Sequence, residues 1–450
     1  MTAFNRRTAL TASAGMLGAG LPRWLRAVEQ SSGGQRTSAK NCIVIYCWGG
    51  MSHHEVLDPK PDAPVEVRGE FSPIATATPG IFIGEHTPLL ARHTDKLAII
   101  RSIHHDQSAH GRGMYWNMTG HAPPPSRPGN IPPSRHDWPS LASMLTKFRS
   151  APRGVPRAVR IPYPMVDNGT LQAGEYGGWM GVEYDPIVMK TPSGKAWGGV
   201  SRSLGAEVLD LDGGVDTDRI TARQSLLSSL ESPARGSDYA GFEHYRQLAT
   251  DMLLSSHVKT AYDLDREDSK LRGQYGDHIA GQSMLLARRL VEAGVPIVQI
   301  ICSAGDLNGG AGDMWDTHGQ NFNRLKNRLL PPFDRGFSTL LSDLSDRGML
   351  DETLVVLLTE FGRTPKINGG AGRDHYPNVY SVALAGGGIR GGQVYGSSDS
   401  KGAFPRTLPC GPADLHATIF KALGVAPNAR IRDLLDRQLA VSDGHPLPLF

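Results

Sequence analysis

The chain has 450 residues, of which 39% are hydrophobic and 20% are charged, with a formal net charge of +3. This composition is that of an ordinary globular protein, and it excludes a disordered chain, a coiled coil and a collagen-like repeat. No apolar run is long enough to predict a membrane span.

Residues 1–30 predict an export signal that is not part of the fold. Arg6 and Arg7 form a twin-arginine start, and a weakly apolar run follows from Ala9 to Leu21. A charged start and a short apolar core are typical of chains that the twin-arginine export machinery carries to the periplasm or the cell exterior. The alternative is a cytoplasmic N-terminal helix, which the glycines of this run disfavour. We therefore expect residues 31–450 to be a single domain.

The positive charge of the chain belongs to this signal. Residues 1–30 contain four arginines and one glutamate, so their removal brings the formal net charge to zero. Because no basic stripe remains, we expect no nucleic-acid partner.

The four cysteines show no zinc-ribbon spacing, and export would permit disulfides. However, Cys42 and Cys47 point to opposite faces of one predicted strand. The pattern therefore favours buried free thiols for Cys42, Cys47, Cys302 and Cys410.

Apolar runs predict the strands of a mostly parallel sheet. The first run lacks polar alternation, which is typical of a central strand covered on both faces. The runs are Asn41–Trp48, Lys96–Ser102, Pro296–Cys302, Leu354–Leu358 and Tyr380–Ala385.

Helical periodicity occurs between these runs. Alternating strands and helices predict an α/β fold, with helices on both faces of a mostly parallel central sheet. Residues 151–214 are interpreted as long loops or an insertion. The predicted helices are Ala109–Met118, Trp138–Phe148 with Asp137 as N-cap, Tyr239–Leu264, Gly281–Ala293, Asn321–Arg347 with Gly348 as C-cap, and Ala413–Leu423.

Charged and imidazole side chains follow most of the predicted strands. Glu360 and Arg363 come directly after Leu354–Leu358, and a glycine-rich loop leads on to Asp374 and His375. Open α/β folds bind their ligands outside the carboxyl ends of the strands. This segment therefore predicts the position of a site.

Two Asp/His pairs predict a metal site. Asp316 and His318 are two residues apart and project to one side, so both can bind one ion. Imidazole and carboxylate are the ligands of zinc and similar divalent metals. Asp374 and His375 are adjacent, so we expect one to bind the ion and the other to support it. The alternatives are a helix N-cap with an exposed histidine for the first pair, and a turn aspartate with a packed histidine for the second.

Three further residues are candidates for catalysis. Glu360 is a candidate metal ligand, a candidate general base, or the ion-pair partner of Arg363. Arg363 has the planar fork that binds phosphate or sulfate oxygens. His110 is the best candidate among the histidines of segment 53–121, because it lies near a predicted helix N-terminus. Ser108 is the hydroxyl best placed as a nucleophile.

Several stretches together resemble a large family of twin-arginine-exported bacterial proteins, a domain family of unknown function grouped with the alkaline phosphatase/sulfatase superfamily. The resemblance implies an alkaline-phosphatase-like fold and a divalent metal, with zinc as the expected ion. The matching stretches are GGMSHHEVLDPKP, VRGEF, RSIHHDQSAHGRGMYWNMTGH, WDTHGQN, TEFGRTPKIN, GRDHYP, LAGGGIRGGQVYGSSD and ADLHATIFKALG.

The resemblance also implies roles for individual residues. TLVVLLTEFG is similar to the strand that ends in the superfamily's metal-binding Asp-His-Gly, so Glu360 keeps the carboxylate and Phe361 replaces the imidazole. His375 is similar to the late metal histidine, and Asp316 and His318 to the other Asp/His pair. The nucleophile position, counted back from Thr119-Gly120, holds His110 in place of a hydroxyl or a thiol.

The resulting expectation is an exported metal-dependent hydrolase of phosphate or sulfate esters, acting on a small anionic or sugar-ester substrate. The alternative is a non-catalytic envelope binding protein that keeps the fold without turnover, which the missing hydroxyl nucleophile and Phe361 favour. The candidate catalytic residues are His110, Glu360 and Arg363, and the candidate metal ligands are Asp316, His318, Glu360, Asp374 and His375.

Overall fold

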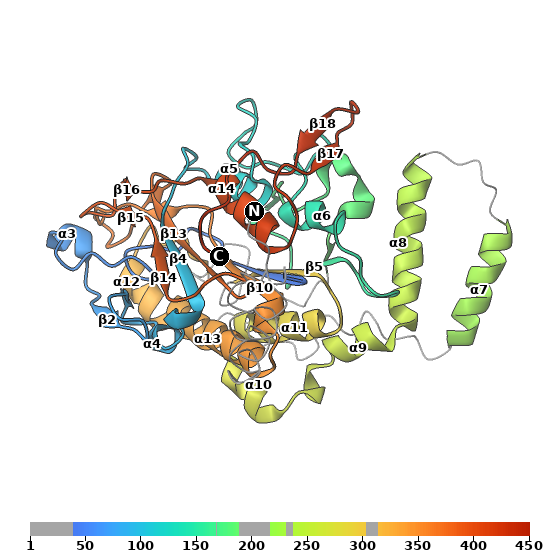
Figure 1. Cartoon of the computed structure of the whole chain (residues 1–450), viewed down its shortest axis with the longest axis horizontal. Coiled ribbons are helices and arrows are strands. Elements are labelled where there is room, and N and C mark those ends of the chain that lie inside the picture. The colour runs from blue at the N-terminus through green and yellow to red at the C-terminus, as the bar shows by residue number, and fades with distance from the viewer. Residues whose placement is uncertain (1–38, 168, 189–216, 231–236, 303–313) are drawn as a thin grey trace, which may run out of the picture. The chain divides into compact units, whose positions relative to one another are not determined.

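An eight-stranded sheet forms the centre of the protein (Figure 1). The computed structural model describes residues 39–167, 169–188, 217–230, 237–302 and 314–450, so the predicted export signal lies outside the described residues. From one edge to the other the strands are β14 (Gln393–Tyr395), β4 (Leu97–Ile103), β13 (Tyr380–Ala385), β10 (Thr353–Leu358), β1 (Asn41–Tyr46), β9 (Ile297–Ile301), β5 (Ala158–Ile161) and β8 (Ile187–Val188).

The sheet is mostly parallel. β1 pairs in parallel with β10 on one side and β9 on the other, whereas β13 is antiparallel to both of its neighbours, β10 and β4. The α/β fold class predicted from the sequence is therefore confirmed, and each of the five apolar runs forms a strand of this sheet. These strands are buried along their length because helices cover both faces.

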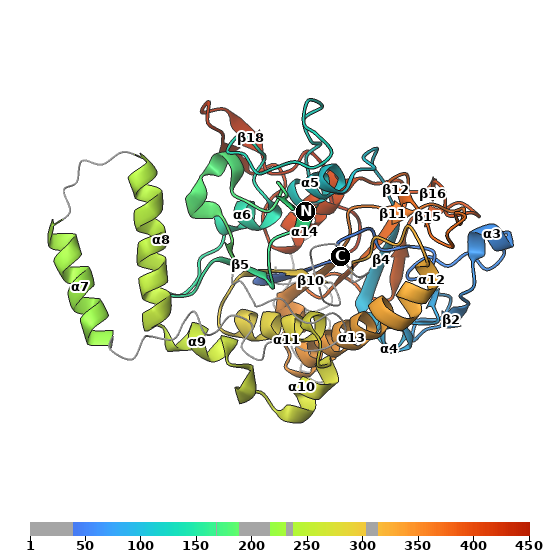
Figure 2. The ribbon, with the colours of Figure 1, turned by 180° about the vertical axis from the view of Figure 1, so that it is seen from behind.

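Two helical layers enclose the sheet (Figures 1 and 2). α11 (Ile279–Glu292) and α13 (Leu330–Asp346) pack on one face. α5 (His110–Thr119), α6 (Leu141–Thr146) and α14 (Pro412–Ala422) pack on the other. All four cysteines are buried free thiols. No helix in the described ranges is long and apolar enough to cross a membrane.

The remaining elements are short or lie outside the sheet. The helical ones are α3 (Val65–Arg68), α4 (Pro88–Ala91), η1 (Thr94–Lys96), η2 (Gly178–Met180), η3 (Val182–Tyr184), α7 (Thr217–Leu230), α8 (Ser237–Leu254), α9 (Ser256–Tyr262), η5 (Leu264–Arg266), α10 (Ser269–Tyr275), α12 (Asn321–Arg324), η6 (Leu325–Leu329) and η7 (Leu350–Glu352). Short antiparallel pairs are β2 (Pro73–Ala75) with β3 (Phe82–Gly84), β6 (Val166–Asp167) with β7 (Thr170–Leu171), β11 (Gly362–Arg363) with β12 (His375–Tyr376), β15 (Ser397–Ser398) with β16 (Pro405–Thr407), and β17 (Arg430–Arg432) with β18 (Gln438–Ala440).

Two expectations about the first half of the chain are wrong. Residues 151–214 were expected to be long loops or an insertion, but β5 and β8, in the described part of this segment, extend the central sheet. The helix expected at Trp138–Phe148 is only α6, and its N-cap is Ser140, whose hydroxyl accepts a hydrogen bond from the Ser143 amide at 3.1 Å. Pro139 explains the late start, because the residue that precedes a proline is disfavoured in helical conformation.

The helices expected at Tyr239–Leu264 and Asn321–Arg347 are both interrupted. The first divides into α8 and α9 at Ser255, which has an extended backbone. The second runs through α12, the π-helical turn η6 and then α13. Pro331 and Pro332 lack the N–H that would bond to the preceding turn, which explains why the α-helical pattern changes just before them. The C-cap of α13 is Arg347, and Gly348, which was predicted as the C-cap, is the next residue and has a φ of 68°.

The direction of the strands places one set of loops together. β1, β9 and β10 run in parallel, and β4 runs in the same direction as β10, because each is antiparallel to β13. Their carboxyl ends therefore meet at one edge of the sheet. The segments that follow these strands carry the candidate site residues.

Candidate functional site

The hairpin of β11 and β12 brings two candidate residues side by side. Arg363 on β11 pairs with His375 on β12. The glycine-rich loop between them closes through the Asn368 side chain, which accepts hydrogen bonds from the amides of Gly370 and Gly372 at 3.0 Å each. His375 therefore lies beside the end of β10, although many residues separate the two in the sequence.

Three side chains meet in front of this hairpin. His375 Nε2 lies 3.2 Å from Asp316 Oδ1 and 2.9 Å from His318 Nε2. His318 Nε2 in turn lies 3.3 Å from the same aspartate oxygen. His110, Asp316 and His375 also have ligand atoms close enough together to bind one ion. The structure thus brings together the two Asp/His pairs that the sequence picked out.

The second ring nitrogen of each histidine is fixed by a hydrogen bond. His375 Nδ1 donates to the Ser108 carbonyl at 2.7 Å, and His318 Nδ1 donates to Asp374 Oδ1 at 2.8 Å. A neutral imidazole whose Nδ1 carries the proton has its lone pair on Nε2. When both rings are neutral, their Nε2 lone pairs face each other and Asp316, an arrangement that a bound cation would stabilise. Asp374 orients the His318 ring in this way.

His110 occupies the start of α5 and connects two carboxylates. Its Nδ1 lies 2.7 Å from Glu360 Oε1, and its Nε2 lies 3.4 Å from Asp316 Oδ2. Burial lowers the pKa of His110, but the hydrogen bonds to Asp316 and Glu360 outweigh it and raise the pKa to about 9. The ring is therefore protonated at neutral pH. The rings of Trp48 and Phe361 flank it, with centroids at 5.3 and 5.0 Å.

Glu360 is separated from the other acidic and imidazole groups by His110. Its carboxylate is fully buried and accepts hydrogen bonds from the Gly49 amide and His110 Nδ1, both at 2.7 Å. The sequence left three roles open for Glu360, as a ligand, a base or the partner of Arg363. The contacts of Glu360 support none of these roles, because the imidazole ring of His110 lies between its carboxylate and Asp316. The ion pair with Arg363 is wrong, since Arg363 binds Asp316 instead.

Arg363 is a buried part of the framework. Its guanidinium donates to the carbonyls of Gly49, Gly50 and Arg373, and its Nη2 lies 2.6 Å from Asp316 Oδ1. The side chain is fully buried. The expected clamp on a substrate anion does not fit these contacts, and we assign Arg363 the role of positioning Asp316.

The charges around Asp316 keep it ionised. Burial raises its pKa, but the hydrogen bond from His110 and the charge of Arg363 hold the pKa well below its usual range. Burial lowers the pKa of His375, and Asp316 opposes this only in part. The arrangement therefore combines an ionised carboxylate with a neutral imidazole, which is the state in which both bind metals.

Glycine at position 49 allows β1 to approach this site. Gly49 has a φ of 115°, and a Cβ there would lie 2.4 Å from the Asp316 amide nitrogen. Sequence reasoning missed this residue and also the Ser108 carbonyl that orients His375. The double glycine directly after the first apolar run was the available signal for Gly49, whereas a main-chain carbonyl leaves no signal in a sequence.

His53, His54 and Asp58 follow β1 and contact other groups in the described structure. His53 and His54 are buried and contact the carbonyls of Gly402 and Lys401 through their Nε2 atoms. Asp58 pairs with Lys60 at 2.9 Å. These three residues therefore belong to the framework after β1.

Comparison with known proteins identifies the family of the chain. Residues 39–449 match a family described as "Protein of unknown function (DUF1501)", so the chain belongs to the DUF1501 family. No curated protein matches it in sequence.

The chain is also similar, at low sequence identity, to solved structures that include the following. The sulfatase PsFucS1 from Pseudoalteromonas sp. has 12% identity and a TM-score of 0.37, covering 89% of this chain and 70% of that one. The phosphonate monoester hydrolase SpPMH from Silicibacter pomeroyi has 12% identity and a TM-score of 0.38, covering 91% and 76%. Ps i-CgsB in complex with k-i-k-neocarrahexaose has 10% identity and a TM-score of 0.41, covering 86% and 72%.

Proposed function

We propose that this DUF1501 protein is an exported hydrolase of phosphate or sulfate esters that holds one divalent metal ion at Asp316, His318 and His375. The observation that carries the proposal is the pair of imidazole Nε2 atoms, 2.9 Å apart, both within 3.3 Å of Asp316 Oδ1. Because each Nδ1 atom is already a donor, this close contact of the two Nε2 atoms requires either a proton or a bound cation between them. Two imidazoles and one carboxylate form a donor set that suits zinc, with an open position for substrate.

The surrounding residues hold this donor set in place. Asp374 and the Ser108 carbonyl fix the tautomers of His318 and His375. Arg363 holds the Asp316 carboxylate from the protein side. His318 is about half exposed, with 47% of its side chain accessible, so ion and substrate reach the site from solvent. A bound divalent ion polarises an ester oxygen and lowers the pKa of a coordinated water.

Water is the nucleophile in this proposal. His110 stands at the helix start where the superfamily resemblance implies the attacking group. Both of its ring nitrogens contact carboxylates, so neither has a free lone pair for attack. His110 instead contacts both Asp316 and Glu360 and fixes the positions of their carboxylates. Its positive charge next to Asp316 favours the binding of an anionic ester at the carboxyl ends of the strands.

A non-catalytic envelope protein that binds a metal or an anion is the second candidate. The observation in its favour is the guanidinium of Arg363, whose Nη2 lies 2.6 Å from Asp316 Oδ1 and so competes with a metal for that oxygen. The buried ring of Phe361 adds to this case, since its centroid lies 4.6 Å from that of His375 and it offers no donor atom.

Metal analysis of the mature chain, residues 31–450, tests the proposal. The wild type and a His257→Ala control, which removes an exposed histidine on α9, should each retain one equivalent of zinc or a similar ion. His318→Ala and His375→Ala should lose it. A panel of phosphate and sulfate esters, with and without chelator, then separates the two candidates. Bound metal without turnover would favour the non-catalytic protein, and retention of metal by both site variants would refute the assigned ligands.

A further inference from the structure

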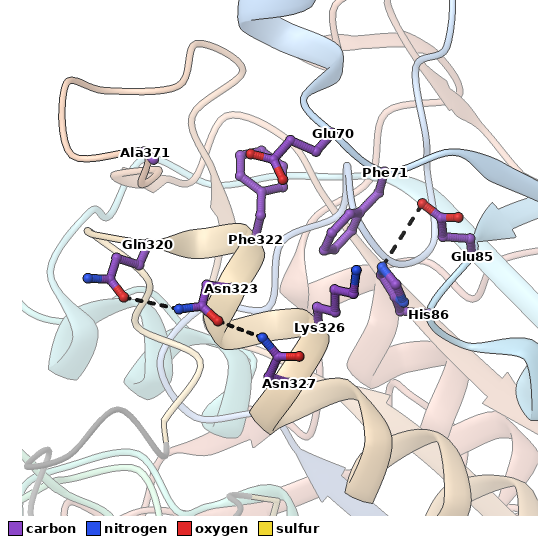
Figure 3. A pocket seen from close by; sticks show the side chains of 10 residues that line it. All are labelled: Glu70, Phe71, Glu85, His86, Gln320, Phe322, Asn323, Lys326, Asn327 and Ala371. Atoms are coloured by element: carbon purple, nitrogen blue, oxygen red, sulfur yellow. Dashed lines mark hydrogen bonds and ion pairs between the residues drawn. The ribbon is translucent and has the colours of Figure 1, made fainter.

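A pocket is lined in part by Gln320 and Ala371, which belong to the two loops that carry the candidate metal ligands (Figure 3). Its volume is about 420 Å³, which is within the usual range for small-molecule sites. Two segments form one wall, because the Gln320 amide donates to the Gly370 carbonyl and the Asn321 amide to the Ala371 carbonyl, both at 2.9 Å. The lining residues are Glu70, Phe71, Glu85, His86, Gln320, Phe322, Asn323, Lys326, Asn327 and Ala371.

The backbone around this pocket is unusual. Gln320 and Ala371 have φ values of 51° and 52°, in the left-handed region that residues with side chains rarely adopt. Lys326 and Asn327 lie on the π-helical turn η6, a conformation that occurs often at functional sites. Backbone strain of this kind persists only where the surrounding structure imposes it. Here both residues with a positive φ lie in the wall of the pocket.

The side chains that line the pocket offer both hydrogen-bond donors and hydrogen-bond acceptors. Figure 3 shows three amides in a row along the helix, joined from Asn323 to Gln320 at 3.3 Å and from Asn327 to Asn323 at 2.6 Å. Each amide keeps donors or acceptors for a ligand. Among the described residues, neither Glu70 nor Lys326 has an ion pair or a side-chain hydrogen bond.

An apolar surface faces these polar groups. The ring of Phe71 packs edge-on against Phe322, with centroids 5.3 Å apart, and against His86 at 4.3 Å. Aromatic carbon of this kind provides a surface for the C–H face of a ligand, while the amides bind its polar edge.

The lining carries charges of both signs, which favours a ligand without a net charge. Lys326 lies in the middle of the lining, which disfavours a cationic ligand. Two carboxylates, Glu70 and Glu85, disfavour an anion. Burial and Lys326 lower the pKa of His86, although Glu85 opposes this, so His86 adds no positive charge at neutral pH.

From this combination of groups we propose that the pocket binds a neutral sugar. The hydroxyls of a sugar both donate and accept, so they match the amides, the free ammonium and the free carboxylate, and its C–H face matches Phe71. This site is distinct from the proposed metal site and does not require it, although the segments 318–321 and 368–374 contribute to both.

Ligand-observed saturation-transfer NMR on the mature chain tests the proposal. The probes are glucose, galactose, N-acetylglucosamine, cellobiose and lactose, each at millimolar concentration, with inorganic phosphate as an anionic comparison. At least one sugar should give a signal. Asn323→Trp, which places a large ring on an exposed position of the wall, should abolish it. Lys326→Ala and Glu70→Ala should each weaken binding by about three- to tenfold, as expected for the loss of one hydrogen bond.

Lys270→Ala, which removes an exposed helical lysine outside the pocket, is the matched control and should leave binding unchanged. Because Lys326 and Glu70 are exposed, their replacement should not disturb folding, and thermal unfolding checks that Asn323→Trp is folded. The proposal is overturned if no sugar binds, if binding survives Asn323→Trp, or if phosphate binds and Lys326→Ala removes that binding.

Discussion

Replacement of Arg373 by methionine should cost the protein a large part of its stability. Arg373 and Glu55 are both fully or almost fully buried, and the guanidinium contacts Glu55 Oε1 through two nitrogens at 3.0 and 2.7 Å. The same guanidinium also donates to the carbonyls of Thr364, Pro365 and Val67. Arg373→Met therefore leaves a buried carboxylate without its cation, for which we expect a loss of about 3–5 kcal/mol in the free energy of unfolding.

Urea unfolding of the mature chain, followed by circular dichroism, measures this loss. Arg406→Met removes an exposed arginine and should change the free energy of unfolding by less than about 0.5 kcal/mol. In the double variant Arg373→Met, Glu55→Gln the carboxylate is absent, so the two effects should fall short of additivity by about 1–3 kcal/mol. Additive effects, or a loss below about 1 kcal/mol in Arg373→Met, would show that the pair does not stabilise this loop as argued.

Three further predictions concern the site and its surroundings. Asp374→Asn removes the carboxylate that orients His318 at 2.8 Å, and should weaken metal binding by about 10- to 100-fold in a competition assay with a chromogenic chelator, while folding is retained. Gly49→Ala forces a Cβ to within 2.4 Å of the Asp316 amide, and should lower both metal content and the unfolding temperature, whereas Gly80→Ala, which meets no atom within 4 Å, should retain the metal. Burial lowers the pKa of His416 to about 4, below the ordinary value of 6.5. The folded state therefore binds fewer protons than the unfolded state, and this histidine should remove about 3 kcal/mol of stability as pH falls from 6.5 to 4, so His416→Gln should show a shallower loss in urea unfolding over that window.

The central strands could be predicted from the sequence because each is covered on both faces. Runs such as Asn41–Trp48 and Leu354–Leu358 show no alternation of polar and apolar residues. A short run of this kind is typical of a strand that is buried on both faces. β5 and β8 were missed because they are short, and β8 lies at the edge of the sheet with partly exposed side chains. Their residues do not form a long apolar run that would distinguish them from loops.

The site could be predicted only in part. Asp316, His318 and His375 were found because acids and imidazoles after strands are visible in sequence, and the structure places them together. The environment of Glu360 could not be predicted, because it depends on His110, which lies at the start of the helix α5, far away in the sequence. The burial of Arg363 depends in the same way on the carbonyls of Gly49 and Gly50. Such contacts are properties of the tertiary fold.

The pairing of β1 with β10 determines when the centre of the sheet, and with it the candidate site at the carboxyl ends of these strands, can form. Thr359 binds the Cys47 carbonyl across 312 positions of sequence, and Asn41 pairs with Thr353. A ribosome must therefore complete most of the chain before the first strand gains a neighbour on that side. Pairing of such distant segments slows folding and leaves apolar strands exposed in the meantime. We expect the nascent protein to depend on chaperones until residues beyond β13 have emerged.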